Sequence, residues 1–196
     1  MARVWQGLYG TWQLKRTLHS MNAAEPSGNC TGQATFTSRT PGVFIDGDGK
    51  LQNASKEMLY SEQGDFEMTN GDAAVQAPKF SFSRKYVWRL DDEKLSNPEI
   101  SVWFVKPGTD QIDYLFHKFL VQNVSERATN GVTPISIECS GGHLCVKDFY
   151  SSTYTFNLKS TPTGNTADDL LDSWIMHHEV RGPKKDQIIE TAFERT

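Results

Sequence analysis

The chain has few cysteines, no metal-binding spacing and no long apolar segment, and each shortage excludes a class of protein. Its 196 residues contain three cysteines, Cys30, Cys139 and Cys145, which form neither an even disulfide framework nor a metal-ligand pattern. Such sparse usage predicts a reducing compartment. The opening stretch MARVWQGLYG lacks the apolar run of a signal peptide, and no stretch approaches the ~20 apolar residues of a membrane span. We therefore expect a cytoplasmic protein without a membrane partner.

Positive charge and glycine-rich loops are also in short supply. The chain carries 20 Lys and Arg against 24 Asp and Glu, which gives a net charge of -4 and a pI near 5.7. This balance argues against a nucleic acid as partner. No phosphate loop, dinucleotide fingerprint or nucleophile elbow is present, so we expect no cofactor. The length predicts a single domain over residues 1–196.

Clusters that favour a metal ion are equally scarce. His177, His178 and Glu179 are adjacent, but neighbouring residues on a strand point to opposite faces and cannot readily share an ion. The segment IDGDGK at 45–50 lacks the bidentate Glu that closes a calcium loop, so it is interpreted as a hairpin turn. The sequence predicts no metal site.

What the chain does contain is alternation of apolar and polar residues over most of its length, with little helical periodicity. Residues 121–131 are expected to form a loop or one helical turn, and residues 161–172 a loop with a short helical end at Asp168–Leu171. A hairpin is expected about Ser140–Gly142. The predicted strands are 8–20, 31–38, 55–66, 80–90, 100–105, 112–120, 135–139, 143–156, 173–180 and 186–195.

Short connections between so many strands predict an all-β fold. An antiparallel meander must protect its edge strands, and closure into a barrel does so. We therefore expect an up-and-down antiparallel barrel of about eight to ten strands with little helix. Eight strands already leave room for one small ligand. A two-sheet sandwich is the alternative.

The stretch GGHLCVKDFYSSTYTF at 141–156 carries an unusual number of reactive side chains for a strand. Alternation places His143, Cys145 and Lys147 on one face and Tyr150 on the other, unless a bulge changes the parity. Together these groups are suited to moving protons on a bound molecule, because an imidazole titrates near neutral pH. Each residue alone is also explained by a structural role at a strand end. A Cys–His catalytic pair would need a lowered thiol pKa, which the sequence does not indicate.

Other candidates lie on neighbouring predicted strands. His117 is a second imidazole, set among Phe and Leu, where a hydrogen-bonded core role is the alternative. An Arg beside aromatic rings, as at Arg84, is suited to stacking or to contact with an anion. The full set of expected substrate-binding residues is Tyr60, Glu62, Arg84, Tyr86, Trp88, Trp103, Phe116, Cys145 and Lys147, with Phe82 as a further apolar wall.

A series of short segments resembles a known family. Gly10-Thr11-Trp12 is similar to the GxW signature of lipocalin-like (calycin) barrels. The whole series resembles the calycin-like domain of unknown function 6314. The resemblance implies a barrel in which Trp12 plugs the closed end and Arg181 or Arg195 stacks across it. The segments are GTW at 10–12, GQATF at 32–36, YSEQG at 60–64, RKYVW at 84–88, DYLFHKF at 113–119, HLCVKDFY at 143–150 and GPKKD at 182–186.

These observations predict a barrel that binds one small hydrophobic or aromatic molecule and performs cofactor-free acid–base chemistry, such as isomerisation, dehydration or cyclisation. His143, His117 and Tyr150 are the expected catalytic residues, with Tyr60 as a second hydrogen-bond donor. A carrier or sensor that uses the same pocket without catalysis is the first alternative. A barrel that docks protein partners on its outer surface is the second, and it predicts a filled interior. The sequence does not set the oligomeric state.

Overall fold

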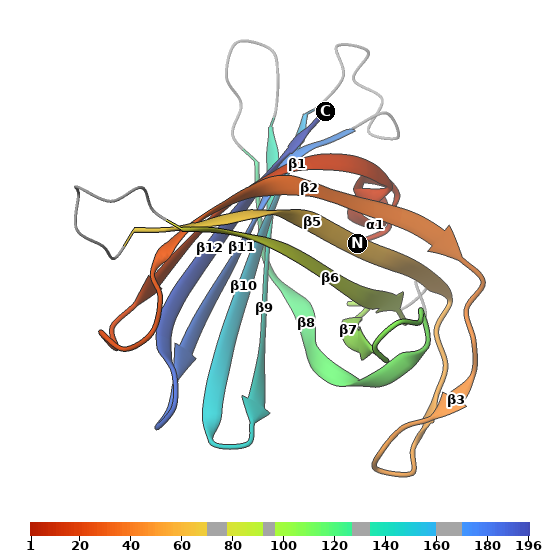
Figure 1. Ribbon diagram of the computed structural model, residues 1–196. Helices are drawn as coiled ribbons and strands as arrows, with labels where there is room; N and C mark the ends of the chain where they lie inside the picture. The colour runs from red at the N-terminus through yellow and green to blue at the C-terminus, as the bar shows by residue number, and fades with distance from the viewer. Residues whose placement is uncertain (70–77, 92–96, 127–133, 160–169) are drawn as a thin grey trace.

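The computed structural model describes residues 1–69, 78–91, 97–126, 134–159 and 170–196. These residues form a closed barrel of ten antiparallel strands, preceded by one short helix (Figure 1). The all-β, antiparallel barrel expected from the sequence is thereby confirmed, and the two-sheet sandwich is excluded. The described residues include no helix long and apolar enough to span a membrane.

The helix α1 covers Ala2–Leu8, and a small separate hairpin is formed by β3, Phe44–Ile45, and β4, Leu51–Gln52. The barrel strands are β1 Gly10–Ser20, β2 Gly28–Arg39, β5 Lys56–Met68, β6 Lys79–Leu90, β7 Ile100–Val105, β8 Ile112–Glu126, β9 Ile135–Cys145, β10 Asp148–Lys159, β11 Leu170–Arg181 and β12 Asp186–Arg195.

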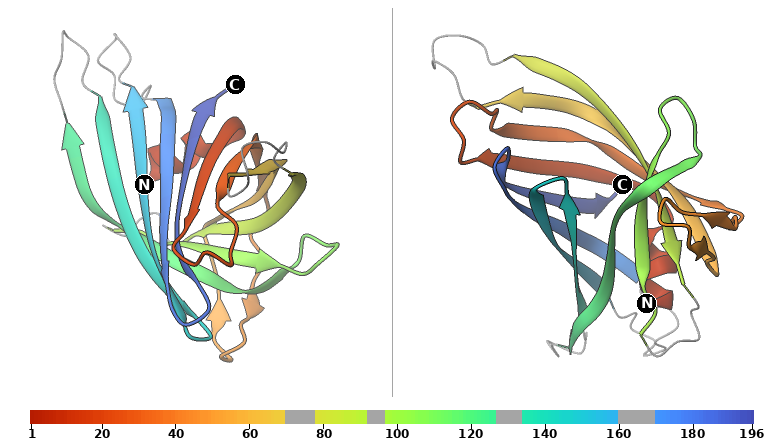
Figure 2. Two further views of the ribbon diagram at one scale, coloured as in Figure 1. Left: turned by 60° about the vertical axis from the view of Figure 1, so that its left-hand side comes forward. Right: turned by 90° about the horizontal axis from the view of Figure 1, so that it is seen from below.

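Each barrel strand pairs with the strands that precede and follow it around the barrel, and β12 returns to pair with β1. In Figure 1, β1, β2, β5 and β6 pass in front of β9–β12, and Figure 2 shows the same strands from two further directions. Closure gives every barrel strand a neighbour on each side and so limits exposed sheet edges, although β6 pairs with β7 only from Tyr86 to Leu90. Alternate residues of every strand therefore face a shared interior.

The closed end is sealed by α1 and by a contact between the two ends of the chain. Trp12 is fully buried and donates from its indole Nε1 to the carbonyl oxygen of Leu8 at 2.8 Å. The guanidinium of Arg195 lies 4.2 Å from the centre of the Trp12 ring and donates to the carbonyl oxygen of Tyr9 at 2.8 Å. Arg195 is thus the basic partner of Trp12, whereas Arg181 pairs with acidic residues at an exposed turn. The predicted first strand began at Leu8, which instead ends the helix.

The hairpin predicted about Ser140–Gly142 is wrong. Strand β9 continues through these residues to Cys145, and the chain turns at Val146 and Lys147, where Val146 has a φ of 60°. Gly141 permits close approach to the neighbouring strand, because a Cβ atom there would lie 1.8 Å from the carbonyl oxygen of Lys118. The glycine pair therefore marks strand contact and not a turn.

Two further boundaries differ from expectation. Residues 121–126, predicted as loop or helical turn, belong to β8, which pairs with β9 as far as Glu126. The polar surface of this segment is consistent with a strand whose outer face meets solvent. Most of the loop and helical end predicted at 161–172 lies outside the described residues, while Leu170 and Leu171 begin β11.

Candidate functional site

The barrel encloses a cavity of about 980 Å³ to which each of the ten strands contributes side chains. Its inner end is formed by buried aromatic rings, including Trp88 and Trp174, whose centroids lie 6.0 Å apart. Residues 23–26, between β1 and β2, and Lys185, before β12, line its other end. The interior is therefore hollow, contrary to what a barrel used only for docking on its outer surface predicts.

A buried ion pair lies inside this cavity. Arg16 of β1 donates two hydrogen bonds to Glu62 of β5, Nη1 to Oε1 at 2.9 Å and Nη2 to Oε2 at 2.7 Å. The hydroxyl of Tyr60 donates to Oε2 of Glu62 at 2.5 Å, and Nε of Arg16 donates to Thr191 at 2.8 Å. Burial opposes the charge of Arg16, but the hydrogen bonds and charge of Glu62 outweigh it and raise the arginine pKa. The carboxylate is thus neutralised and held in one orientation.

This cluster revises the roles expected of Tyr60 and Glu62. Both residues line the cavity as predicted. The proton of Tyr60 is already donated to Glu62, and burial followed by the charge of Glu62 raises the tyrosine pKa well above its usual value. The partner Arg16 was missed, because it lies 46 positions from Glu62 in the sequence and nothing local links the two.

A β-bulge in β8 brings two consecutive residues into the cavity. Val102 of β7 pairs with His117 and Trp103 pairs with Leu115, so Phe116 is the extra residue between them. Such a bulge redirects side chains that strict alternation would send to opposite faces. Phe116 and His117 consequently both line the cavity. Both residues were predicted as site residues, but the sequence did not indicate the bulge that turns both of them inward.

His117 is buried and only half satisfied by hydrogen bonds. Its Nε2 lies 2.5 Å from the hydroxyl of Tyr154 on β10, whereas its buried Nδ1 has no hydrogen-bond partner among the described residues. Burial lowers the pKa of His117 well below 6.5, and the neighbouring His178 and His143 lower it further. Burial, with smaller effects of Tyr86 and Cys139, raises the pKa of Tyr154 well above 10. Both groups are therefore neutral at pH 7.

His178 of β11 is, with His117, the second imidazole that lines the cavity, and it was not predicted as a site residue. Its Nδ1 lies 2.7 Å from the hydroxyl of the fully buried Ser152 on β10. The His177–His178 pair was considered only as a metal site. Strand alternation does send His178 inward, while His177 lies on the outside near Glu190. Trp174, Met176 and His178 alternate along β11 and all line the cavity. This alternation was the sequence signal from which His178 could have been identified.

Near the cavity mouth, the β9–β10 hairpin changes the predicted faces. His143 is paired with Tyr150, and Cys145 with Asp148, so all four side chains share one face. Tyr150 and Cys145 line the cavity, and the His143 ring lies 5.8 Å from that of Phe116 and 6.2 Å from that of Tyr150. Burial lowers the pKa of His143. The predicted separation of His143 from Tyr150 was therefore wrong, and the error came from the misplaced turn.

Two predicted binding residues lie outside the cavity. Trp103 is buried on the outer face of β7, where its indole donates to Ser101 at 2.9 Å and its ring lies 5.1 Å from Phe44 of the β3–β4 hairpin. Lys147 is exposed in the β9–β10 turn. Neither lines the cavity. The other predicted residues, Arg84, Tyr86 and Trp88 on β6, do line it, and burial raises the pKa of Tyr86 to about 12.

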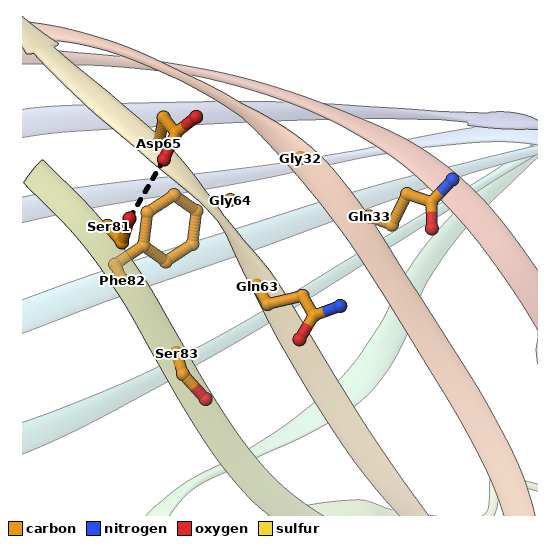
Figure 3. Close-up of a pocket in the computed structure, with 8 residues that line it drawn as sticks. All are labelled: Gly32, Gln33, Gln63, Gly64, Asp65, Ser81, Phe82 and Ser83. Atoms are coloured by element: carbon orange, nitrogen blue, oxygen red, sulfur yellow. Dashed lines mark hydrogen bonds between the residues drawn. The ribbon is translucent and has the colours of Figure 1, made fainter. Parts of the chain in front are cut away.

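A second hollow, of about 550 Å³, opens on β2, β5 and β6 (Figure 3). It forms where Gly32 and Gly64 pair across the strands and leave no side chains. Gln33, Gln63 and Ser83 border it, and Ser81 donates to Asp65 at 3.1 Å. These exposed side chains offer hydrogen bonds but no imidazole or thiol. The imidazoles and thiols that line a hollow therefore belong to the central cavity. Among the described residues no three His, Cys, Asp or Glu side chains are grouped to hold a metal ion.

The buried imidazoles predict that acid destabilises the fold. Burial, followed by the charge of Arg16 and by His177, lowers the pKa of His178 from 6.5 to about 4. The unfolded chain then takes up a proton that the folded chain does not, so stability is complete above pH 6.5 and is lost as pH falls towards 4. The full loss is about 3 kcal/mol for His178 alone, and about 2 kcal/mol of it falls between pH 7 and pH 4.5. Urea unfolding at pH 7 and pH 4.5 measures it.

The matched variants are His178→Gln and His19→Gln, since His19 is exposed on β1. We expect the loss of unfolding free energy between the two pH values to shrink in His178→Gln and to be unchanged in His19→Gln. An equal pH-dependent loss in both variants would show that His178 does not titrate as inferred.

Comparison with known proteins gives one match. The chain matches the family described as "Family of unknown function (DUF6314)" over residues 8–195. No curated protein and no solved structure matches it. The match covers all ten barrel strands and assigns no reaction to them.

Proposed function

Because the chain belongs to the DUF6314 family, whose function is unknown, we propose a function from the residues of the cavity. The cavity binds one small, largely apolar or aromatic molecule. Its side chains perform cofactor-free acid–base chemistry on that molecule. Isomerisation, dehydration and cyclisation are reactions of this type. They require positioned proton donors and acceptors in a site shielded from water.

The unpaired Nδ1 of His117 is the observation that carries the proposal. Tyr154 keeps its proton, because burial raises its pKa well above 10, and the only described acceptor for that proton is Nε2 of His117. Nδ1 then carries the imidazole proton and is a buried donor without an acceptor in the described part of the chain. Leaving such a group unpaired costs roughly 1–3 kcal/mol. A ligand oxygen that accepts this hydrogen bond recovers the cost.

The rings of three histidines surround the ring of Phe116. Phe116 lies 4.4 Å from His117 and 5.8 Å from both His143 and His178, measured between ring centroids. A ligand stacked on Phe116 would meet His117 and His178, which line the cavity, with His143 next to Phe116 at the cavity mouth. His117 donates to a ligand oxygen, while the imidazole of His143, whose pKa burial lowers, accepts a proton from the ligand. Tyr150, beside His143, supplies a second hydroxyl donor.

The barrel is proposed to be a member of the calycins and to act in the cytoplasm. The stacking of Arg195 on Trp12 at the closed end supports the first assignment, because the GxW resemblance implies it. The three cysteines are free, as expected in a reducing compartment, and this supports the second.

A carrier or sensor that binds the same molecule without changing it is the second candidate. It is favoured by the Arg16–Glu62–Tyr60 cluster, in which the carboxylate and one phenol of the cavity are already occupied by each other. Fewer free acid–base groups then face the ligand. In this case the imidazoles only orient it.

Native mass spectrometry of the purified protein tests both candidates by revealing a co-purified molecule. That molecule, once identified, is incubated with the wild type and with the His117→Gln/His143→Gln double variant. Turnover by the wild type that the double variant lacks supports catalysis. Binding by both proteins with recovery of unchanged compound supports the carrier and rejects the enzyme.

A further inference from the structure

We infer that the molecule held in the cavity is an anion, whose negative group is bound at the mouth by Arg84 and Lys185 while its apolar or aromatic body lies along the rings below. This inference rests on the proposed function, since it takes the central cavity to be the ligand site. It adds the charge and the orientation of the ligand, which the proposed chemistry leaves open.

The charged residues that line the cavity are unequally balanced. There are three cations, Arg16, Arg84 and Lys185, and two carboxylates, Glu25 and Glu62. Glu62 is fully engaged by Arg16 and Tyr60, and Glu25 accepts a hydrogen bond from Gln187. Glu62 is therefore unavailable to a cationic ligand, and with the charge of Glu25 acting on Lys185 the described lining still holds one more cation than carboxylate.

Arg84 is a cation of the lining that forms no ion pair with a carboxylate of the described residues. It lies directly opposite Glu62 in the β5–β6 pairing, but Glu62 uses both of its oxygens for Arg16. No carboxylate of the described residues forms an ion pair with Arg84, although its neighbour Lys85 on the outer face pairs with Asp110 at 2.7 Å. A guanidinium presents a planar fork of donors that matches a carboxylate or another oxyanion.

Lys185 lines the same cavity from the β11–β12 turn. The β11–β12 turn that carries it is fixed by a hydrogen bond from the backbone N–H of Lys184 to Asp148, at 3.1 Å. Its Nζ donates to the hydroxyl of Tyr150 at 3.1 Å and lies 5.8 Å from the centre of that ring. The bond to Tyr150 uses one of the three donors of the ammonium, so donors remain for an anion, and Glu25 is the described carboxylate whose charge acts on Lys185.

A continuous aromatic surface joins the two cations. Tyr86, two residues from Arg84 on the same face of β6, stacks on Phe116 at 5.8 Å, and Phe116 contacts Tyr150 at 6.0 Å. Tyr150 in turn bonds to Lys185. An aromatic carboxylate, phenolate or sulfonate would rest its rings on this surface with its charge between Arg84 and Lys185.

Two fluorescent probes with the same ring system separate charge from apolar binding. These are 8-anilinonaphthalene-1-sulfonate, which is an anion, and N-phenyl-1-naphthylamine, which is neutral. Their dissociation constants are measured by titration of the folded wild type and of the variants Arg84→Gln, Lys185→Gln and Lys85→Gln. Lys85→Gln is the matched control, because it removes a positive charge from the adjacent, outward-facing position.

We expect Arg84→Gln and Lys185→Gln each to weaken binding of the anionic probe about tenfold at low salt, as for the loss of one charge-assisted contact. Each substitution is expected to change the dissociation constant of the neutral probe less than about twofold, because that probe carries no charge. Lys85→Gln is expected to change the dissociation constant of either probe less than about twofold, since it alters only surface charge. Added salt should weaken the anionic probe in the wild type and not in the double variant Arg84→Gln/Lys185→Gln.

The outcomes separate this inference from the proposed function. Equal effects on both probes, or an anionic probe insensitive to both substitutions, would overturn the anion assignment while the neutral probe still reports a ligand cavity. If neither probe binds the folded wild type, the ligand-binding function itself fails, and the inference with it.

Discussion

The free energy of unfolding of the Arg16→Met variant is expected to be about 3–5 kcal/mol lower than that of the wild type, because the substitution leaves a buried carboxylate without its counter-ion. Only 2% of the Glu62 side chain is exposed, and two of its three hydrogen bonds come from Arg16. Met retains most of the volume of the arginine stem, so the loss reports charge and not a large cavity. Urea unfolding at pH 7 measures the difference.

The double variant Arg16→Met/Glu62→Gln is expected to recover most of the lost stability, since it removes both buried charges. Lys15→Met is the matched control: Lys15 is the adjacent residue of β1, points outward and has a 70% exposed side chain. A loss of less than about 1 kcal/mol in Arg16→Met, the size expected of an exposed pair, would contradict the view that this ion pair is desolvated.

The His117→Gln variant is expected to lose about 10²–10⁴-fold in kcat towards the molecule that the protein turns over, the range for removing one acid–base group. Gln keeps an amide that can bond with Tyr154, but unlike an imidazole it cannot pass a proton to the ligand and take it back. Binding of the neutral probe should change little, because the apolar walls of the cavity are retained. The measurement is therefore a comparison of kcat with the probe dissociation constant.

His19→Gln serves as the control, since His19 is exposed on the outside of β1. A structural role of His117 predicts a different pattern, in which stability and probe binding fall together with kcat and a stabilising condition such as low temperature restores all three. Unchanged kcat in a folded His117→Gln variant would remove His117 from the mechanism. His178, fixed by Ser152, would then be the next imidazole to replace.

Much of the architecture was predictable, because alternation of apolar and polar residues is a local property of a strand. The strand Ile100–Val105 was predicted with its observed bounds, and the expected barrel closes as a meander of ten strands. Inward alternation also identified Tyr60, Glu62, Arg84 and Tyr86 as residues of one cavity. Errors arose where a local signal was ambiguous, as at Gly141, where a glycine indicates either a turn or a close strand contact.

The sequence by itself determined the residue types of the cavity and the family to which the chain belongs. Only the tertiary structure decided which of those residues meet. Arg16 reaches Glu62 because β1, β2 and β5 are neighbours in a closed barrel, and the Phe116 bulge turns two consecutive side chains inward. The physical reason is that the register of the strands and the positions of the bulges depend on how the strands pair around the barrel. A charged side chain therefore meets its partner on another strand, and residues close to it in the sequence do not indicate which one.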